Sequence, residues 1–129
     1  MSSHRLAVAL AAAVMLAAAP VAAPARDAGP AVVVNMTFGL KFDPAEVRVR
    51  AGQTVEWRNK AFFPHTVTFD PAQAANKDNV ALPAGVMPFA SKGMEEGSTF
   101  SHTFSVKGTY KYICVYHEAM GMVGTVIVS

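Results

Sequence analysis

The sequence of 129 residues contains a single cysteine, Cys114, and a single tryptophan. One cysteine excludes an internal disulfide framework. Charged residues make up only 16% of the chain, with 11 Lys and Arg against 9 Asp and Glu. Such a balanced charge argues against a nucleic-acid-binding protein, which usually has a clear basic excess. The chain also lacks internal repeats, so its length predicts one domain.

Residues 1–25 have the three-part pattern of a secretory signal peptide. Arg5 lies in a short polar start, a long Ala/Val/Leu run follows, and small residues precede a cleavage site that we expect after Ala25. Two prolines interrupt the apolar run, which disfavours an uncut membrane anchor. We therefore expect a mature domain of residues 26–129 that is periplasmic or otherwise extracytoplasmic and free of the membrane.

Short runs with strand chemistry follow along the mature chain, separated by turn residues. They are rich in β-branched and aromatic residues, and several alternate apolar and polar positions. These runs are residues 31–38, 46–50, 54–59, 65–70, 98–106, 109–115 and 124–129. This pattern predicts an all-β sandwich. Residues 71–97 interrupt it and look like an excursion outside the sheets, with a possible short helix over 71–78.

The segment "YKYICVYHEAMGM" places the only cysteine beside other metal-ligating side chains. Cys114 is followed by His117, and Met120 and Met122 come three and five residues after this histidine. Soft sulfur ligands suit Cu(I), whereas imidazole suits Cu(II), so one thiolate, two histidines and a weak methionine could hold both states. Such a site needs a second histidine from elsewhere in the chain.

Two other histidines remain in the mature chain. His65 follows Pro64 at the start of an alternating run. His102 alternates with Phe100 and Phe104, so its face of the strand is expected in the core. We therefore expect His65 to complete the site and leave His102 out of it.

Two long segments resemble the blue copper proteins, or cupredoxins, of the plastocyanin/pseudoazurin type. "FDPAEVRVRAGQTVEWRNKAFFPHTVTFD" is similar to the family segment with F-x-P, A-G-x-T-V and N-x-x-x-x-P-H. "KGTYKYICVYHEAMGMVGTVIV" is similar to the last family segment, in which K-G-T-Y leads to C-x-x-H-x-x-x-x-M-V-G. The resemblance covers nearly all of the mature chain.

This resemblance implies an eight-stranded Greek-key β-sandwich with one type 1 copper ion bound by His65, Cys114, His117 and Met122. It implies a small exported carrier of single electrons, cycling between Cu(II) and Cu(I), and not an enzyme. Met122 has the spacing of plastocyanins and pseudoazurins, and we favour it. Met120 has the spacing of amicyanins and remains the alternative axial ligand.

The sequence departs from the family at three positions near the expected ligands. Tyr116 replaces the proline that many relatives have before the second histidine. We expect its N–H to raise the reduction potential if it points at the Cys114 sulfur. Thr66 and Val115 replace the residues that commonly brace the two ligand loops, which puts this bracing in question.

We expect a monomer whose partners are a redox protein donor and acceptor, docking at an apolar patch around His117. The expected patch comprises Leu40, Pro64, Pro83, Ala84, Met120 and Gly121. A structural zinc site would usually use more cysteines, and a Cys-His nucleophile would need an accessible thiolate. Copper delivery without electron transfer uses the same ligands and remains the alternative function.

Overall fold

The structure is a computed structural model that describes residues 9–18 and 29–129. The cleavage site expected after Ala25 lies outside the described residues. Residues 9–18 are exposed and form neither helix nor strand. In the described part of the chain, no helix is both long and apolar enough to cross a bilayer.

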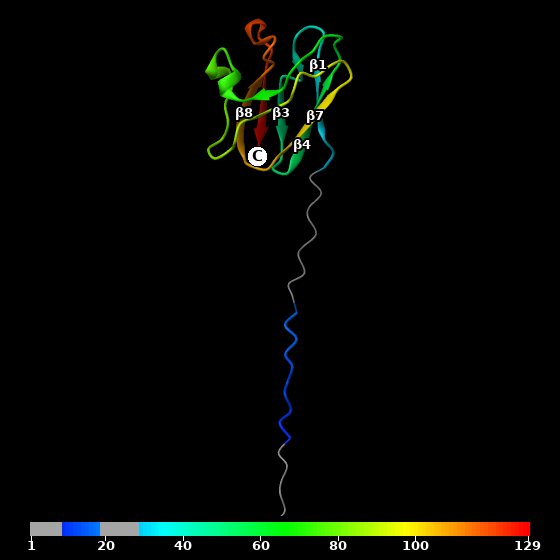
Figure 1. Ribbon diagram of the computed structural model, residues 1–129, viewed down its shortest axis with the longest axis vertical. Coiled ribbons are helices and arrows are strands. Elements are labelled where there is room, and N and C mark those ends of the chain that lie inside the picture. The colour runs from blue at the N-terminus through cyan, green and yellow to red at the C-terminus, as the bar shows by residue number, and fades with distance from the viewer. Residues whose placement is uncertain (1–8, 19–28) are drawn as a thin grey trace, which may run out of the picture.

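Two β-sheets packed face to face form the domain (Figure 1). The first sheet has the order β2 (Phe42–Asp43), β1 (Val32–Met36), β4 (Gln53–Asn59) and β7 (Thr99–Phe104). The second has the order β3 (Glu46–Val49), β9 (Val123–Val128), β8 (Gly108–Ile113), β5 (Thr68–Phe69) and β6 (Phe89–Ala90). The predicted all-β sandwich is confirmed. The described residues form nine strands where eight were expected, and two of these, β2 and β6, have only two residues each.

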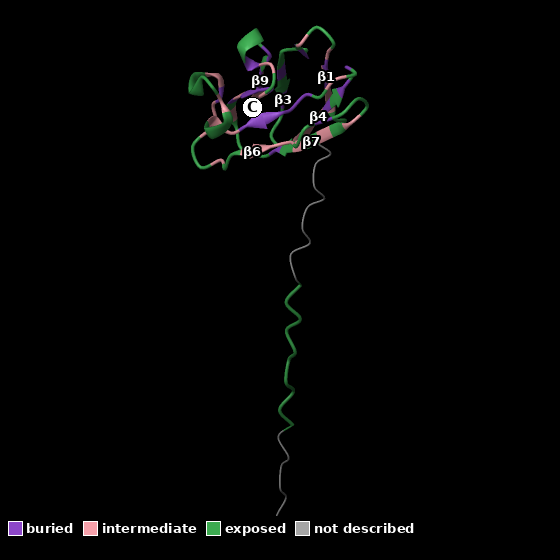
Figure 2. Cartoon of the chain, turned by 45° about the horizontal axis from the view of Figure 1, so that its top comes forward, coloured by how far each residue is buried: buried purple, intermediate pink, exposed green. Residues whose placement is uncertain are grey.

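Alternating side chains build the core between the sheets. Figure 2 colours the buried residues purple, and several strands carry them. In β3 the buried residues are Val47 and Val49, and their neighbours are exposed. The centre holds Trp57 and Tyr112, both fully buried, with Trp57 Nε1 donating a hydrogen bond of 2.9 Å to the Tyr112 hydroxyl. Gly124 pairs with Tyr112 across β8 and β9, and any Cβ there would clash with the Tyr112 ring.

The excursion at 71–97 differs from its prediction in two ways. Two single-turn 3-10 helices, η1 (Pro71–Gln73) and η2 (Lys77–Asn79), take the place of one short helix. Each has its own N-cap, Asp70 and Asn76, whose side chains accept a hydrogen bond from the backbone two residues later. In addition, β6 joins the second sheet, so the excursion does not lie wholly outside the sheets.

Candidate metal centre

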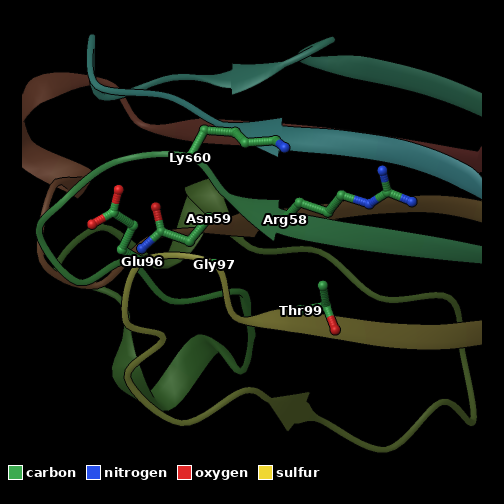
Figure 3. A pocket seen from close by; sticks show the side chains of 6 residues that line it. All are labelled: Arg58, Asn59, Lys60, Glu96, Gly97 and Thr99. Atoms are coloured by element: carbon green, nitrogen blue, oxygen red, sulfur yellow. The ribbon is translucent and has the colours of Figure 1, made fainter.

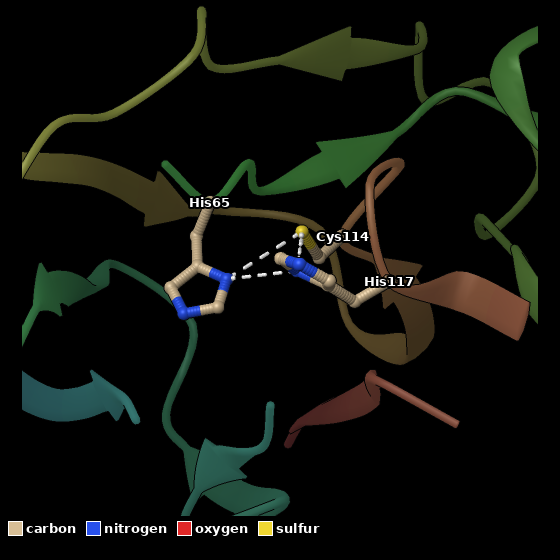
Figure 4. A group of neighbouring side chains, drawn as sticks. All are labelled: His65, Cys114 and His117. Carbon is tan, nitrogen blue, oxygen red and sulfur yellow. Dashed lines mark hydrogen bonds between the residues drawn. The ribbon is translucent and has the colours of Figure 1, made fainter. Parts of the chain in front are cut away.

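Three side chains with metal-ligating atoms meet at one end of the sandwich (Figure 4). The Nδ1 atoms of His65 and His117 are 3.2 Å apart, and the Cys114 sulfur lies 3.7 Å and 3.5 Å from them. Cys114 directly follows β8, and His117 immediately precedes the 3-10 helix η3 (Glu118–Met120). His65 lies ahead of β5, far away in the sequence, so only the fold brings the three together.

His65 is held in one orientation and one tautomer. Its backbone exchanges two hydrogen bonds with Met94. This isolated bridge stands where the beginning of a longer strand, over 65–70, was expected. Its Nε2 lies 3.0 Å from the carbonyl oxygen of Thr37. A carbonyl can only accept, so Nε2 carries the proton and Nδ1 turns a lone pair toward the centre.

The pKa of His65 lies below its ordinary value. Burial is the main cause, the hydrogen bond to Thr37 acts against it, and the neighbouring His117 lowers the pKa further. A neutral imidazole is the form that ligates a metal ion. The fold therefore prepares His65 for coordination.

Asn59 fixes the segment that carries His65. This buried side chain donates to the carbonyl oxygens of Phe63 (3.0 Å) and Met94 (2.8 Å) and accepts from Ala61 N–H (2.8 Å). The sequence pattern N-x-x-x-x-P-H contained this residue, but no role was assigned to it. Asn59 also lines the pocket of Figure 3, whose other lining residues are Arg58, Lys60, Glu96, Gly97 and Thr99.

Cys114 is fully buried, and its sulfur accepts a hydrogen bond of 3.3 Å from the Thr66 N–H. Hydrogen bonds to a sulfur stabilise negative charge on it. The Thr66 hydroxyl accepts a hydrogen bond of 2.9 Å from Val115 N–H and lies 3.0 Å from the Thr68 hydroxyl. The brace between the two ligand loops, which the sequence put in question, is therefore present, with the Val115 backbone replacing a side chain.

The hydrogen bond expected from Tyr116 to the sulfur is not among those of the described residues, where the backbone donor to Cys114 Sγ is Thr66. Tyr116 is instead half-exposed, with its hydroxyl over Gly93. The expectation that Tyr116 raises the potential by this bond loses its structural basis.

The two candidate axial methionines differ in burial. Met122 is fully buried and belongs to the same core cluster as Cys114, and its carbonyl oxygen accepts from Cys114 N–H at 3.1 Å. Met120 ends η3 with 56% of its surface exposed. This contrast favours Met122 on the inner side of the ligand loop.

Three phenylalanines connect the histidines to the surface. The Phe63 ring lies 5.2 Å from His65 and 5.7 Å from His117, and it packs against Phe62 and Phe38, which are 70% and 62% exposed. We call Phe38, Phe62 and Phe63 the aromatic rim. The aromatic rim was not predicted from the sequence, although the adjacent phenylalanines in "NKAFFPH" were a visible signal.

The expected apolar patch needs correction at one side. Pro83, followed by Ala84, packs against Gly108, which begins β8 and pairs with Val128. Cys114 follows the other end of β8, so Pro83 lies away from the candidate centre. The error arose because the path of the long excursion was not visible in the sequence.

Comparisons with known proteins agree with this geometry. Residues 31–129 match the family described as copper binding proteins, plastocyanin/azurin family. The chain belongs to the plastocyanin/azurin family of copper-binding proteins. It is 39% identical over 97 residues to a chloroplastic plastocyanin of Pisum sativum, a match covering 70% of this chain and 53% of that protein. A plastocyanin of Scenedesmus fuscus is 36% identical over 90 residues, covering 70% of this chain and 88% of that protein.

Solved structures give the same fold assignment. An amicyanin variant in its oxidised state superposes with a TM-score of 0.60 at 31% identity, over 77% of this chain and 82% of that one. Another amicyanin variant in its Cu(I) form has a TM-score of 0.61 at 31% identity, over 81% and 88% of the two chains. The cupredoxin fold is thereby confirmed.

The residues present fit the copper ion that membership of the plastocyanin/azurin family implies. Two imidazole nitrogens and one sulfur converge with their ligating atoms within 4.8 Å of one another, a soft and borderline donor set that suits copper. As a member of this family, the protein is a small blue copper protein, a class of electron carriers and not of enzymes. The substrate of a Cys-His nucleophile must reach the cysteine sulfur. The Cys114 sulfur is fully buried, which argues against such a catalytic pair.

Proposed function

We propose that this protein carries single electrons between extracytoplasmic redox partners, with His65, Cys114, His117 and Met122 as the ligands of its copper. The convergence of His65, Cys114 and His117 carries the proposal. When bound, copper supplies a one-electron couple between Cu(II) and Cu(I) that both sulfur and imidazole ligands tolerate. Met122, buried in the same core cluster as Cys114, would supply the fourth ligand, a thioether sulfur.

The chain's own contribution is to keep these ligands still. Cys114 is clamped by the Thr66 N–H and His65 by Thr37, and both loops are joined through the bond between Thr66 and Val115. Hydrogen bonds of this kind orient the ligands and limit their movement between the Cu(II) and Cu(I) states. Small movement means a small reorganisation energy, which favours rapid electron exchange.

His117 is the proposed exit for electrons. It is only half-buried, whereas His65 and Cys114 are fully buried. The aromatic rim (Phe38, Phe62 and Phe63) and the exposed Met120 surround this end with apolar surface. A small apolar contact suits partners that must dissociate quickly. We propose that donor and acceptor dock here, and that the free protein is a monomer.

The proposed location follows from residues 1–25, which have a signal-peptide pattern with cleavage after Ala25. A mature chain of 26–129, in a periplasm or another extracytoplasmic compartment, contains the whole matched region 31–129. Mass spectrometry of the exported protein would show whether its first residue is Arg26.

Electron self-exchange between copies tests the docking proposal with the protein as its own partner. Phe62→Asp places a charge on the rim of both copies, so we expect self-exchange, measured by NMR line broadening, to fall by about tenfold or more. Met87→Asp is the matched control, because Met87 is 79% exposed and lies in the excursion, four residues after Pro83. Equal effects of both variants would contradict the rim as the contact.

Copper delivery is the alternative that the same preparation can test. Stopped-flow reduction and oxidation should be far faster than the loss of copper to a competing chelator. The opposite order would favour delivery. The burial of Cys114, His65 and Met122 supports retention, because a chelator cannot reach them without opening the fold.

A further inference from the structure

Glu118, the residue after the proposed ligand His117, has a buried carboxylate that bonds the excursion. We infer that Glu118 is a positioning residue, which fixes the ligand loop against residues 75–79 and so sets the geometry and strength of copper binding. This inference rests on the proposed function.

The contacts of this carboxylate are extensive. Glu118 is only 8% exposed, although it is charged and lies in a loop. One oxygen accepts from Ala75 N–H at 2.7 Å, and the other accepts from Asn76 N–H at 3.0 Å and lies 3.4 Å from Asn79 Nδ2. Hydrogen bonds from backbone N–H groups to a carboxylate are among the stronger ones in proteins.

The ligand loop depends on the position of Glu118. It begins η3, and its carbonyl oxygen accepts from Gly121 N–H at 2.9 Å. The carbonyl oxygen of His117 accepts from Met120 and Met122 N–H, at 3.0 and 3.2 Å. These hydrogen bonds link the turn between the two proposed ligands into one unit, and the Glu118 side chain connects this unit to the excursion.

The excursion is a firm anchor because it is fixed to β8. Ala81 and Lys111 exchange two backbone hydrogen bonds, of 3.2 and 2.9 Å, and the Lys111 ammonium donates to the carbonyl oxygen of Asp78 at 2.6 Å. β8 in turn leads directly into Cys114. Through Glu118, the excursion therefore connects two proposed copper ligands, Cys114 after β8 and His117 before Glu118.

Two variants break this contact from opposite sides. Glu118→Gln keeps the size of the side chain but turns one acceptor into a donor facing N–H groups. Ala75→Pro removes the N–H donated at 2.7 Å without touching the ligand loop, and Ala74 before it already has the extended backbone that precedes proline. Asp70→Ala is the matched control, because it removes the cap of η1 but no contact to Glu118.

Copper affinity by chelator competition and the paramagnetic resonance spectrum of the Cu(II) form are the two readouts. We expect Glu118→Gln and Ala75→Pro each to alter the spectrum and to weaken copper binding about tenfold. This is the lower end of the loss, about 10–100-fold, that follows removal of a residue that orients metal ligands. The double variant should be no weaker than either single variant. Asp70→Ala should match wild type. Unchanged affinity and spectrum in both variants would overturn the inference, even if thermal stability falls.

A measurement on the wild-type protein keeps the test independent of variants that fail to fold. If the contact couples the excursion to the metal centre, binding at one must stabilise the other. Copper should therefore slow amide hydrogen exchange at Ala75 and Asn76. Equal exchange with and without copper overturns the inference but leaves the proposed function intact. A wild-type protein that forms no thiolate-to-copper band overturns both.

Discussion

Thr66→Val tests the brace between the two ligand loops. The substitution keeps the shape of the side chain and leaves the Thr66 N–H free to bond the Cys114 sulfur. It removes the hydroxyl that accepts from Val115 N–H and pairs with the Thr68 hydroxyl. Two polar groups thus lose their partner in one step.

The expected cost follows from these two groups. A buried polar group without a partner costs about 1–3 kcal/mol. The Thr68 side chain is 1% exposed and cannot reach water, whereas Val115 is half-buried and recovers part of its loss. After the gain from one buried methyl, we expect a net loss of about 2 kcal/mol, or roughly 10 °C in Tm. Copper affinity should fall by about 10–100-fold, because the brace orients both ligand loops.

Urea unfolding of the metal-free protein measures the first quantity, and chelator competition measures the second. Thr66→Val combined with Thr68→Val is the decisive comparison. The double variant leaves only Val115 N–H without its partner, so it should be more stable than Thr66→Val alone by about 1 kcal/mol. A double variant that is less stable than the single, or a single variant with wild-type stability and affinity, would refute the reasoning.

Three further predictions concern separate parts of the molecule. Met122→Ala should shift the thiolate-to-copper spectrum, whereas Met120→Ala should not; the reverse result would make Met120 the axial ligand. Burial lowers the pKa of His102, so folding disfavours its charged form and stability should fall as pH drops below about 6.5. His102→Phe should reduce this fall in pH-dependent urea unfolding, and an unchanged slope would count against it. Tyr112→Phe leaves the buried Trp57 N–H without an acceptor, at a cost of about 1–3 kcal/mol in unfolding free energy, and a neutral result would be inconsistent with that hydrogen bond.

The sequence predicted those features whose signal is local. Alternation in residues 46–50 and 54–59 gave two strands, β3 and β4, within one residue of their observed bounds. His102 shares one face of β7 with Phe100 and Phe104, as expected, but of these three residues only Phe104 is fully buried. His102 lies half-buried at the margin of the core, where its ring stacks on Phe89 with the ring centroids 3.8 Å apart. Such patterns are readable because neighbours along a strand face opposite sides of a sheet.

The features that escaped prediction depend on contacts between distant residues. The bond between Thr66 and Val115 spans 49 positions, and that between Glu118 and Ala75 spans 43. Neither residue pair has a motif of its own. The same limitation placed Pro83 near His117, because the route of a long irregular segment depends on tertiary contacts and not on local preference.

The two single-turn helices within 71–79 illustrate the competition between local signals. Alanines favour a continuous helix, but Asp70 and Asn76 each begin a new cap. Ala74 between them is extended, and the N–H groups of Ala75 and Asn76 donate to the Glu118 carboxylate. A tertiary acceptor thus replaced the hydrogen bonds of a longer helix.

Copper addition to the purified mature chain, followed by visible and paramagnetic resonance spectroscopy, tests the central claim most directly. We predict one copper ion per chain, an intense blue or green thiolate-to-copper band and narrow hyperfine splitting. The band and the narrow splitting should both be lost in Cys114→Ser. A wild-type protein that binds copper without this band, or a Cys114→Ser variant with an unchanged spectrum, would contradict the account.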